Sequence, residues 1–165
     1  MKKFTAFVLL ITAILTFAAC GAEGAVTYKN DVSVSAIAEA TNAALANGEE
    51  MVIVPETYVT AIMDVDTANF AEFAVYKQVV GAVIDEYGIF KVNDPEYIDT
   101  ALASLNNYIN LTREESMVPQ YMPEEQPKFD AAEARAIGEY VVFCILSEDA
   151  KAAVFEAVSD ILSEK

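Results

Sequence analysis

The sequence contains no histidine and no tryptophan among its 165 residues. Histidine is the usual general base and the usual partner of serine and cysteine nucleophiles, so its absence excludes the common forms of those enzymes. Two cysteines are present, too few for a zinc site built from Cys and His ligands. No Gly-rich phosphate-binding loop occurs either. The sequence therefore predicts no cofactor and no metal site.

Basic residues are also scarce, with 10 Lys and Arg against 26 Asp and Glu, which gives a formal net charge of −16. Proteins that bind nucleic acid need a basic surface, so no nucleic-acid partner is expected. An anionic membrane surface would repel the chain for the same reason. A strongly acidic surface is typical of a domain that must stay soluble.

The first twenty residues have the pattern of an export signal. Lys2 and Lys3 precede an uncharged apolar run, residues 4–19, which is shorter than the roughly 20 residues a transmembrane helix needs. Small residues then surround Cys20 in the segment Ala-Ala-Cys-Gly, residues 18–21. This segment resembles the lipobox of bacterial lipoproteins, in which the cysteine receives diacylglycerol and becomes the first mature residue. Phe17 stands where that motif usually has leucine.

The prediction is a signal peptide over residues 1–19, lipid attachment at Cys20 and a tether over residues 20–30. Membrane lipid is thus the expected partner of acylated Cys20, and the protein is expected on the extracytoplasmic face of the bacterial cell membrane. An ordinary secretory signal with an incidental cysteine is the alternative. Once Cys20 is acylated, Cys144 is the one remaining cysteine, so no intramolecular disulfide can form.

Residues 31–165 predict a single α+β domain. Apolar positions at helical spacing indicate helices over residues 31–47 and 55–63, from residue 95 past 113, and after Ser147. Strands are expected over residues 72–80, 86–92, 131–137 and 139–146. The last of these is apolar on both faces, which places it inside a sheet covered on both sides. The expected fold is a four-stranded, mostly antiparallel sheet packed against helices.

Two acidic segments invite a functional interpretation. Asp64 and Asp66 suggest a calcium loop, but Ala68 and Val75 stand where an EF-hand needs ligands, so a capped helical turn is favoured. A proline-rich connection follows the long helix and contains Tyr121, Glu124 and Glu125. An aromatic ring beside carboxylates could contact a ligand or partner. The favoured interpretation is that Tyr121 and Met122 only fasten this loop to the core.

Four segments carry a resemblance to a known family. They are IMDVD at residues 62–66, EYGIFK at 86–91, YMPEE at 121–125 and GEYV at 138–141. Together with the export signal, they resemble small lipoproteins of low-GC Gram-positive bacteria that carry a domain of unknown function. The resemblance implies a fold and a location, and it supplies no catalytic residues.

The favoured function is a non-catalytic binding domain at the cell envelope, with an envelope protein or a wall component as its partner. Cys144 lies in an apolar strand and is expected to be a core residue rather than a reactive thiol. The alternative is a hydrolase of wall polymer or peptide that uses two carboxylates alone. Adjacent acids occur at residues 49–50, 114–115 and 124–125, but sequence neighbours rarely face each other.

Overall fold

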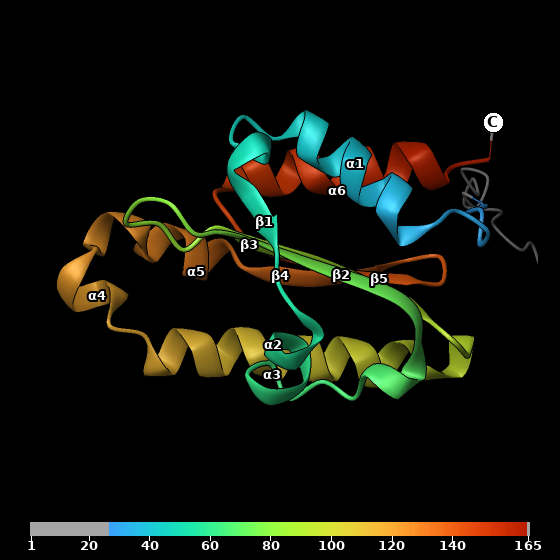
Figure 1. Cartoon of the computed structure of the whole chain (residues 1–165), viewed down its shortest axis with the longest axis horizontal. Coiled ribbons are helices and arrows are strands. Elements are labelled where there is room, and N and C mark those ends of the chain that lie inside the picture. Colours follow the sequence, from blue (N-terminus) through green and yellow to red (C-terminus); the bar gives the residue numbers. More distant parts are fainter. Residues whose placement is uncertain (1–26, 165) are drawn as a thin grey trace, which may run out of the picture.

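The computed structural model describes residues 27–164, which form three layers (Figure 1). A five-stranded antiparallel sheet lies in the middle. Helices α1 (Val34–Ala44) and α6 (Glu148–Leu162) cover one face, while α2 (Glu56–Ala61) and α3 (Ile98–Glu115) cover the other. Within residues 27–164, no helix is long and apolar enough to cross a membrane. The predicted α+β class is confirmed.

The strands are ordered β1-β2-β3-β5-β4 across the sheet. Their bounds are β1 Met51–Ile53, β2 Phe70–Gln78, β3 Glu86–Val92, β4 Glu133–Ile137 and β5 Tyr140–Ile145. Four of them match predicted strands to within three residues at each end. The prediction of a four-stranded sheet was wrong, because β1 adds a fifth strand.

Strand β1 was missed because it is short and lies at the edge of the sheet. It has three residues, pairs with β2 from Met51↔Gln78 to Ile53↔Tyr76, and is followed closely by Pro55. Met51 is buried, whereas the other two residues are exposed. Three residues are too few to show an alternating pattern, so the sequence carried no strand signal here.

Strand β5 forms the centre of the core, as its sequence predicts. All six of its residues are buried. Tyr140, Val142 and Cys144 belong to the core cluster that includes α1 and α6 residues. Val141, Phe143 and Ile145 belong to the cluster that includes α2 and α3 residues. Because both faces of this strand are covered by helices, a continuous apolar run is stable in it.

The connection from α3 to β4 contains more structure than the sequence predicts. It forms helix α4 (Val118–Tyr121), a 3-10 turn (Pro123–Glu125) and helix α5 (Gln126–Ala131). Each of these begins with a proline in its first two positions, where the fixed φ of proline suits a helix and its missing N–H costs nothing. The prolines that suggested an irregular loop therefore start short helical turns.

Side-chain caps begin several helical segments. Ser147 Oγ accepts a hydrogen bond from the Ala150 N–H at the start of α6, as expected. The first helix begins later than predicted, because Ser33 rather than Asp31 caps α1. The Asp66 carboxylate caps the 3-10 turn Thr67–Asn69 by accepting from the Ala68 N–H. The capped-turn interpretation of this segment is confirmed.

Gly88, in the middle of β3, is required by close packing. A Cβ at this position would lie 2.9 Å from Val75 Cγ2 and would also overlap the ring of the fully buried Phe143. We expect Gly88→Ala to lower the free energy of unfolding by about 1–3 kcal/mol, since an added methyl in a filled core forces its neighbours to move. Urea denaturation measures this change. A second substitution, Phe143→Leu, should recover part of the loss, and no effect of Gly88→Ala would contradict the packing.

Candidate functional site

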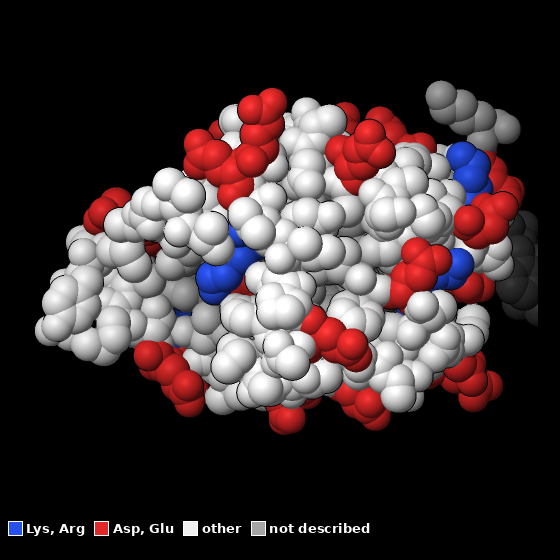
Figure 2. All heavy atoms as spheres, in the orientation of Figure 1, with Lys and Arg blue, Asp and Glu red and all other residues white. Residues whose placement is uncertain are grey.

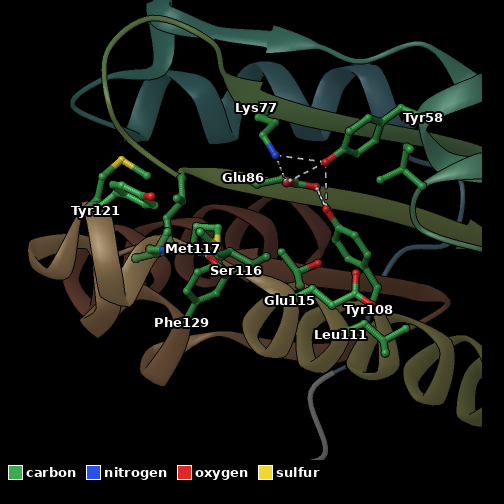
Figure 3. A pocket seen from close by; sticks show the side chains of 16 residues that line it. Tyr58, Lys77, Glu86, Tyr108, Leu111, Glu115, Ser116, Met117, Tyr121 and Phe129 are labelled. Carbon is green, nitrogen blue, oxygen red and sulfur yellow. Dashed lines mark hydrogen bonds and ion pairs between the residues drawn. The ribbon is translucent and has the colours of Figure 1, made fainter.

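A cavity of about 630 Å³ opens on the α3 side of the sheet, beside the end of that helix (Figure 3). This volume lies within the range of roughly 300–1,000 Å³ that is typical of ligand pockets. Most of the lining side chains are apolar or aromatic. The lining residues are Tyr58, Ile62, Lys77, Ile84, Glu86, Tyr108, Leu111, Thr112, Glu115, Ser116, Met117, Val118, Tyr121, Met122, Phe129 and Ile145.

Four polar side chains form a closed network in this cavity, which we call the floor network (Figure 3). Glu86 is 1% exposed, and its Oε1 accepts from the Tyr108 hydroxyl at 2.8 Å. Its Oε2 accepts from Lys77 Nζ at 3.0 Å and from the Tyr58 hydroxyl at 3.2 Å. The two tyrosine oxygens lie 2.9 Å apart, and Lys77 Nζ also donates to the Tyr58 oxygen at 3.1 Å. Each group therefore has at least two partners.

Strand register places the charged pair of the floor network. Lys77 of β2 lies directly opposite Glu86 of β3 in the antiparallel ladder. Directly opposite residues project to the same face of a sheet and can touch. Helix α3 supplies Tyr108 and helix α2 supplies Tyr58. The network therefore joins two strands to both helices that cover this face.

Burial and neighbouring groups keep Lys77 and Tyr108 of the floor network protonated. Burial alone would lower the pKa of Lys77, but the Glu86 carboxylate and the Tyr58 hydroxyl raise it above its ordinary 10.5. Burial, and then the neighbouring Glu86 carboxylate, raises the pKa of the Tyr108 hydroxyl. At neutral pH Lys77 is thus a cation and Tyr108 is uncharged. Neither group is in the deprotonated form that a nucleophile or a general base requires.

Exposed apolar side chains surround the mouth of the cavity, and we call them the rim. Met117 is 57% exposed, and Ile62, Leu111 and Tyr121 are also exposed. Glu115, on the last turn of α3, is the exposed acidic group of the lining. On the face drawn in Figure 2, Asp and Glu lie along most of the outline but not at its left end, and Lys and Arg are few.

The structure separates the three residues that the sequence proposes for ligand or partner contact. Tyr121 lies on the rim with 67% of its surface exposed. Its neighbour Met122 packs against the core and also lines the cavity. Glu124 is exposed and does not line the cavity. Glu125 is 7% exposed and holds the fold together, so the cavity contains only Tyr121 of the proposed set.

Glu125 belongs to a second polar cluster, which fastens the β2–β3 connection to α5. Its Oε2 accepts from the Ile84 N–H at 3.0 Å and from Lys128 Nζ at 2.8 Å. Lys128 also forms an ion pair with Asp85, and Asp85 accepts from the Asn47 amide at 2.8 Å. Ile84 lines the cavity. This cluster therefore holds one wall of the cavity in place.

The structure describes one of the two cysteines. Cys20 lies outside the described residues, so its lipidation stays a prediction. Cys144 is fully buried in β5, and burial raises the pKa of its thiol. The expectation that Cys144 is a core residue is confirmed. Within residues 27–164, no group of three or more acidic or cysteine side chains is arranged to hold a metal ion.

Sequence reasoning missed all four members of the floor network. Tyr108 lies within the predicted long helix and packs in the core. Lys77 and Glu86 lie within two of the predicted strands. A signal for them was present, because they flank the β2–β3 connection and carry opposite charges. The exact register of a seven-residue connection, residues 79–85, cannot be derived from the sequence, so the pairing was not predicted.

One family model matches the chain, over residues 43–146, and it describes a domain of unknown function, DUF4358. The match covers more than half of the sequence. The chain belongs to the DUF4358 family. Every residue that lines the cavity lies inside the DUF4358 domain, whereas α6 lies outside it. No curated protein and no solved structure matches the chain.

The expected resemblance to a family with a domain of unknown function is therefore confirmed. The lipoprotein character and the bacterial source that accompanied this resemblance stay predictions. Because the floor network and the rim both lie inside the DUF4358 domain, the site belongs to the part of the chain that the family match covers.

Substituting Lys77 tests the floor network. We expect Lys77→Met to lower the free energy of unfolding by about 2–3 kcal/mol, because the buried Glu86 carboxylate loses its cation and keeps only the tyrosine hydroxyls. In a Glu86→Gln background the same substitution should cost about 1 kcal/mol or less. Urea denaturation of the four proteins in this cycle measures the coupling. Equal costs in both backgrounds would show that the pair does not interact.

Proposed function

We propose that this protein is a lipid-anchored, extracytoplasmic binding domain and that the cavity is its ligand site. The observation that carries the proposal is the combination of an apolar cavity with an ordered polar floor. Ligand sites typically have this composition, since apolar walls supply affinity and a few fixed polar groups supply orientation. An envelope protein, a wall component or a smaller envelope molecule could occupy such a site.

The state of the floor network favours binding over catalysis. Both carboxylate oxygens of Glu86 already accept hydrogen bonds. Lys77 is held as a cation by its neighbours, although a lysine nucleophile needs a lowered pKa. A preformed network of this kind is rigid, which reduces the entropy lost when a ligand binds.

A carboxylate-only hydrolase of wall polymer or peptide is the second candidate, because Glu86 and Glu115 both line the cavity. The two groups differ in environment, since Glu86 is buried and Glu115 is exposed. Glu115→Gln separates the two functions. It should abolish turnover if the protein is a hydrolase, and it should leave ligand capture intact if the protein only binds.

The membrane location rests on the export signal and on the short tether. Residues 21–26 separate Cys20 from the described part of the chain, and six residues span at most about 20 Å. From Tyr28 onward the chain is fixed to the fold, because Tyr28 pairs with Ser163 and the Lys29 N–H donates to the Leu162 carbonyl at 2.8 Å. The domain is therefore expected within a few nanometres of the lipid.

Cys20→Ala tests the anchor. We expect this variant to fold normally but to lose lipidation and normal processing, because the acylated thiol is gone. Incorporation of a labelled fatty acid and partition into detergent measure both losses. Cys144→Ala is the matched control, since it removes the other cysteine and should leave labelling unchanged. A Cys20→Ala protein that is still cleaved and membrane-bound would overturn the anchor.

Photo-crosslinking tests the site. A photoreactive phenylalanine analogue placed at Met117 should capture a specific envelope component in intact cells, because this position lies on the rim. The same analogue at Ile53 is the control, since Ile53 is equally exposed at 57% but does not line the cavity. Capture of the same molecules at both positions, or no capture at either, would contradict a binding role for the cavity.

A further inference from the structure

We infer that the ligand of the cavity is an uncharged amphiphile, with one hydrocarbon chain against the walls and a hydroxyl or ester group on Lys77. This inference rests on the proposed binding function and narrows it to one chemical class. It follows from three features of the cavity. They are the third N–H of Lys77, the balance of charge and the apolar character of the walls.

Lys77 provides the donor for the head group. An ammonium group carries three N–H bonds, and the floor network uses two of them, for Glu86 and for the Tyr58 hydroxyl. The Lys77 side chain is 33% exposed, so its third N–H is available at the cavity. A ligand oxygen, such as that of a hydroxyl or an ester carbonyl, would accept a hydrogen bond from this third N–H of Lys77.

The charge of the site disfavours an ionic head group. The positive charge of Lys77 is already balanced by Glu86, 3.0 Å away. The exposed carboxylate of Glu115 adds a negative charge to the cavity, and the whole chain carries −16. An anionic head group is therefore repelled. A cationic head group would have to approach the ammonium of Lys77. An uncharged acceptor avoids both costs.

The walls suit a hydrocarbon chain. Phe129, Val118 and Ile145 are buried apolar residues of the lining, and two methionines, Met117 and Met122, lie beside them. Methionine side chains are flexible and adapt to chains of different shape. The protein has no tryptophan side chain that could stack on a sugar ring. Largely apolar walls with few polar groups fit an amphiphile better than a carbohydrate.

A single introduced tryptophan provides the test. The natural sequence has none, so Tyr121→Trp places one fluorescent reporter on the rim. The cell-processed full chain is reconstituted in phosphatidylcholine nanodiscs and titrated with lipids whose chains carry bromine, which quenches tryptophan on contact. The three probes are a dibromostearoyl monoacylglycerol, dibromostearic acid and the matching primary amine, at a mildly alkaline pH where the acid is ionised and the amine is charged.

The monoacylglycerol should quench the reporter saturably, and the acid and the amine should need roughly tenfold higher concentration or more. Adding Met117→Glu should abolish the saturable quenching. Ile53→Glu, at a position of equal exposure outside the cavity, should leave it unchanged. The double variant Lys77→Met with Glu86→Gln should lose the preference for the uncharged head group.

Three results would contradict the inference, each in a different way. Equal or tighter binding of the acid or the amine, with the Met117→Glu loss preserved, would overturn the uncharged class and leave the proposed site standing. No saturable quenching by any lipid, together with specific protein capture at Met117, would replace the amphiphile with a protein partner. Quenching that Met117→Glu and Ile53→Glu affect equally would place lipid contact outside the cavity and overturn the inference.

Discussion

The cross-strand pair of Lys77 and Glu86 is the interaction on which the rest of this site depends. A buried carboxylate is costly unless a cation and hydrogen-bond donors surround it. Here the strand register supplies the cation from β2, and the hydroxyls of Tyr58 and Tyr108 supply two more donors. The requirement to satisfy one carboxylate thus ties α2 and α3 to the sheet. The polar floor of the cavity is the result.

A second charged cluster holds a further part of the cavity wall. Lys128 of α5 pairs with both Asp85 and Glu125, and Glu125 accepts the Ile84 N–H. These bonds hold the β2–β3 connection against α5, so that Ile84 forms part of the wall. Helix α3 ends at Glu115, and the chain continues through the short helix α4. Three exposed side chains of the rim, Leu111, Met117 and Tyr121, come from this part of the chain (Figure 3).

Much of the fold could be predicted from the sequence. The two apolar faces of β5 required a covered central strand, and Ser147 marked the start of α6, because burial and capping leave local patterns. The edge strand β1 and helices α4 and α5 left no such pattern, since each has three to six residues. The cavity was harder still. The four residues of its floor network come from four elements, and only the three-dimensional arrangement brings them together. Tyr121 was proposed from its aromatic and exposed character, and it does lie on the rim.

Native mass spectrometry of the protein purified gently from the cells that make it tests the central claim most directly. If the cavity is an occupied ligand site, the intact protein should carry a discrete additional mass of a few hundred daltons beyond the mass of the same preparation measured under denaturing conditions. That mass should be retained in Ile53→Glu and absent in Met117→Glu. A spectrum in which all three proteins show only the covalent mass would contradict the account, and so would an added mass that persists unchanged when the rim is altered.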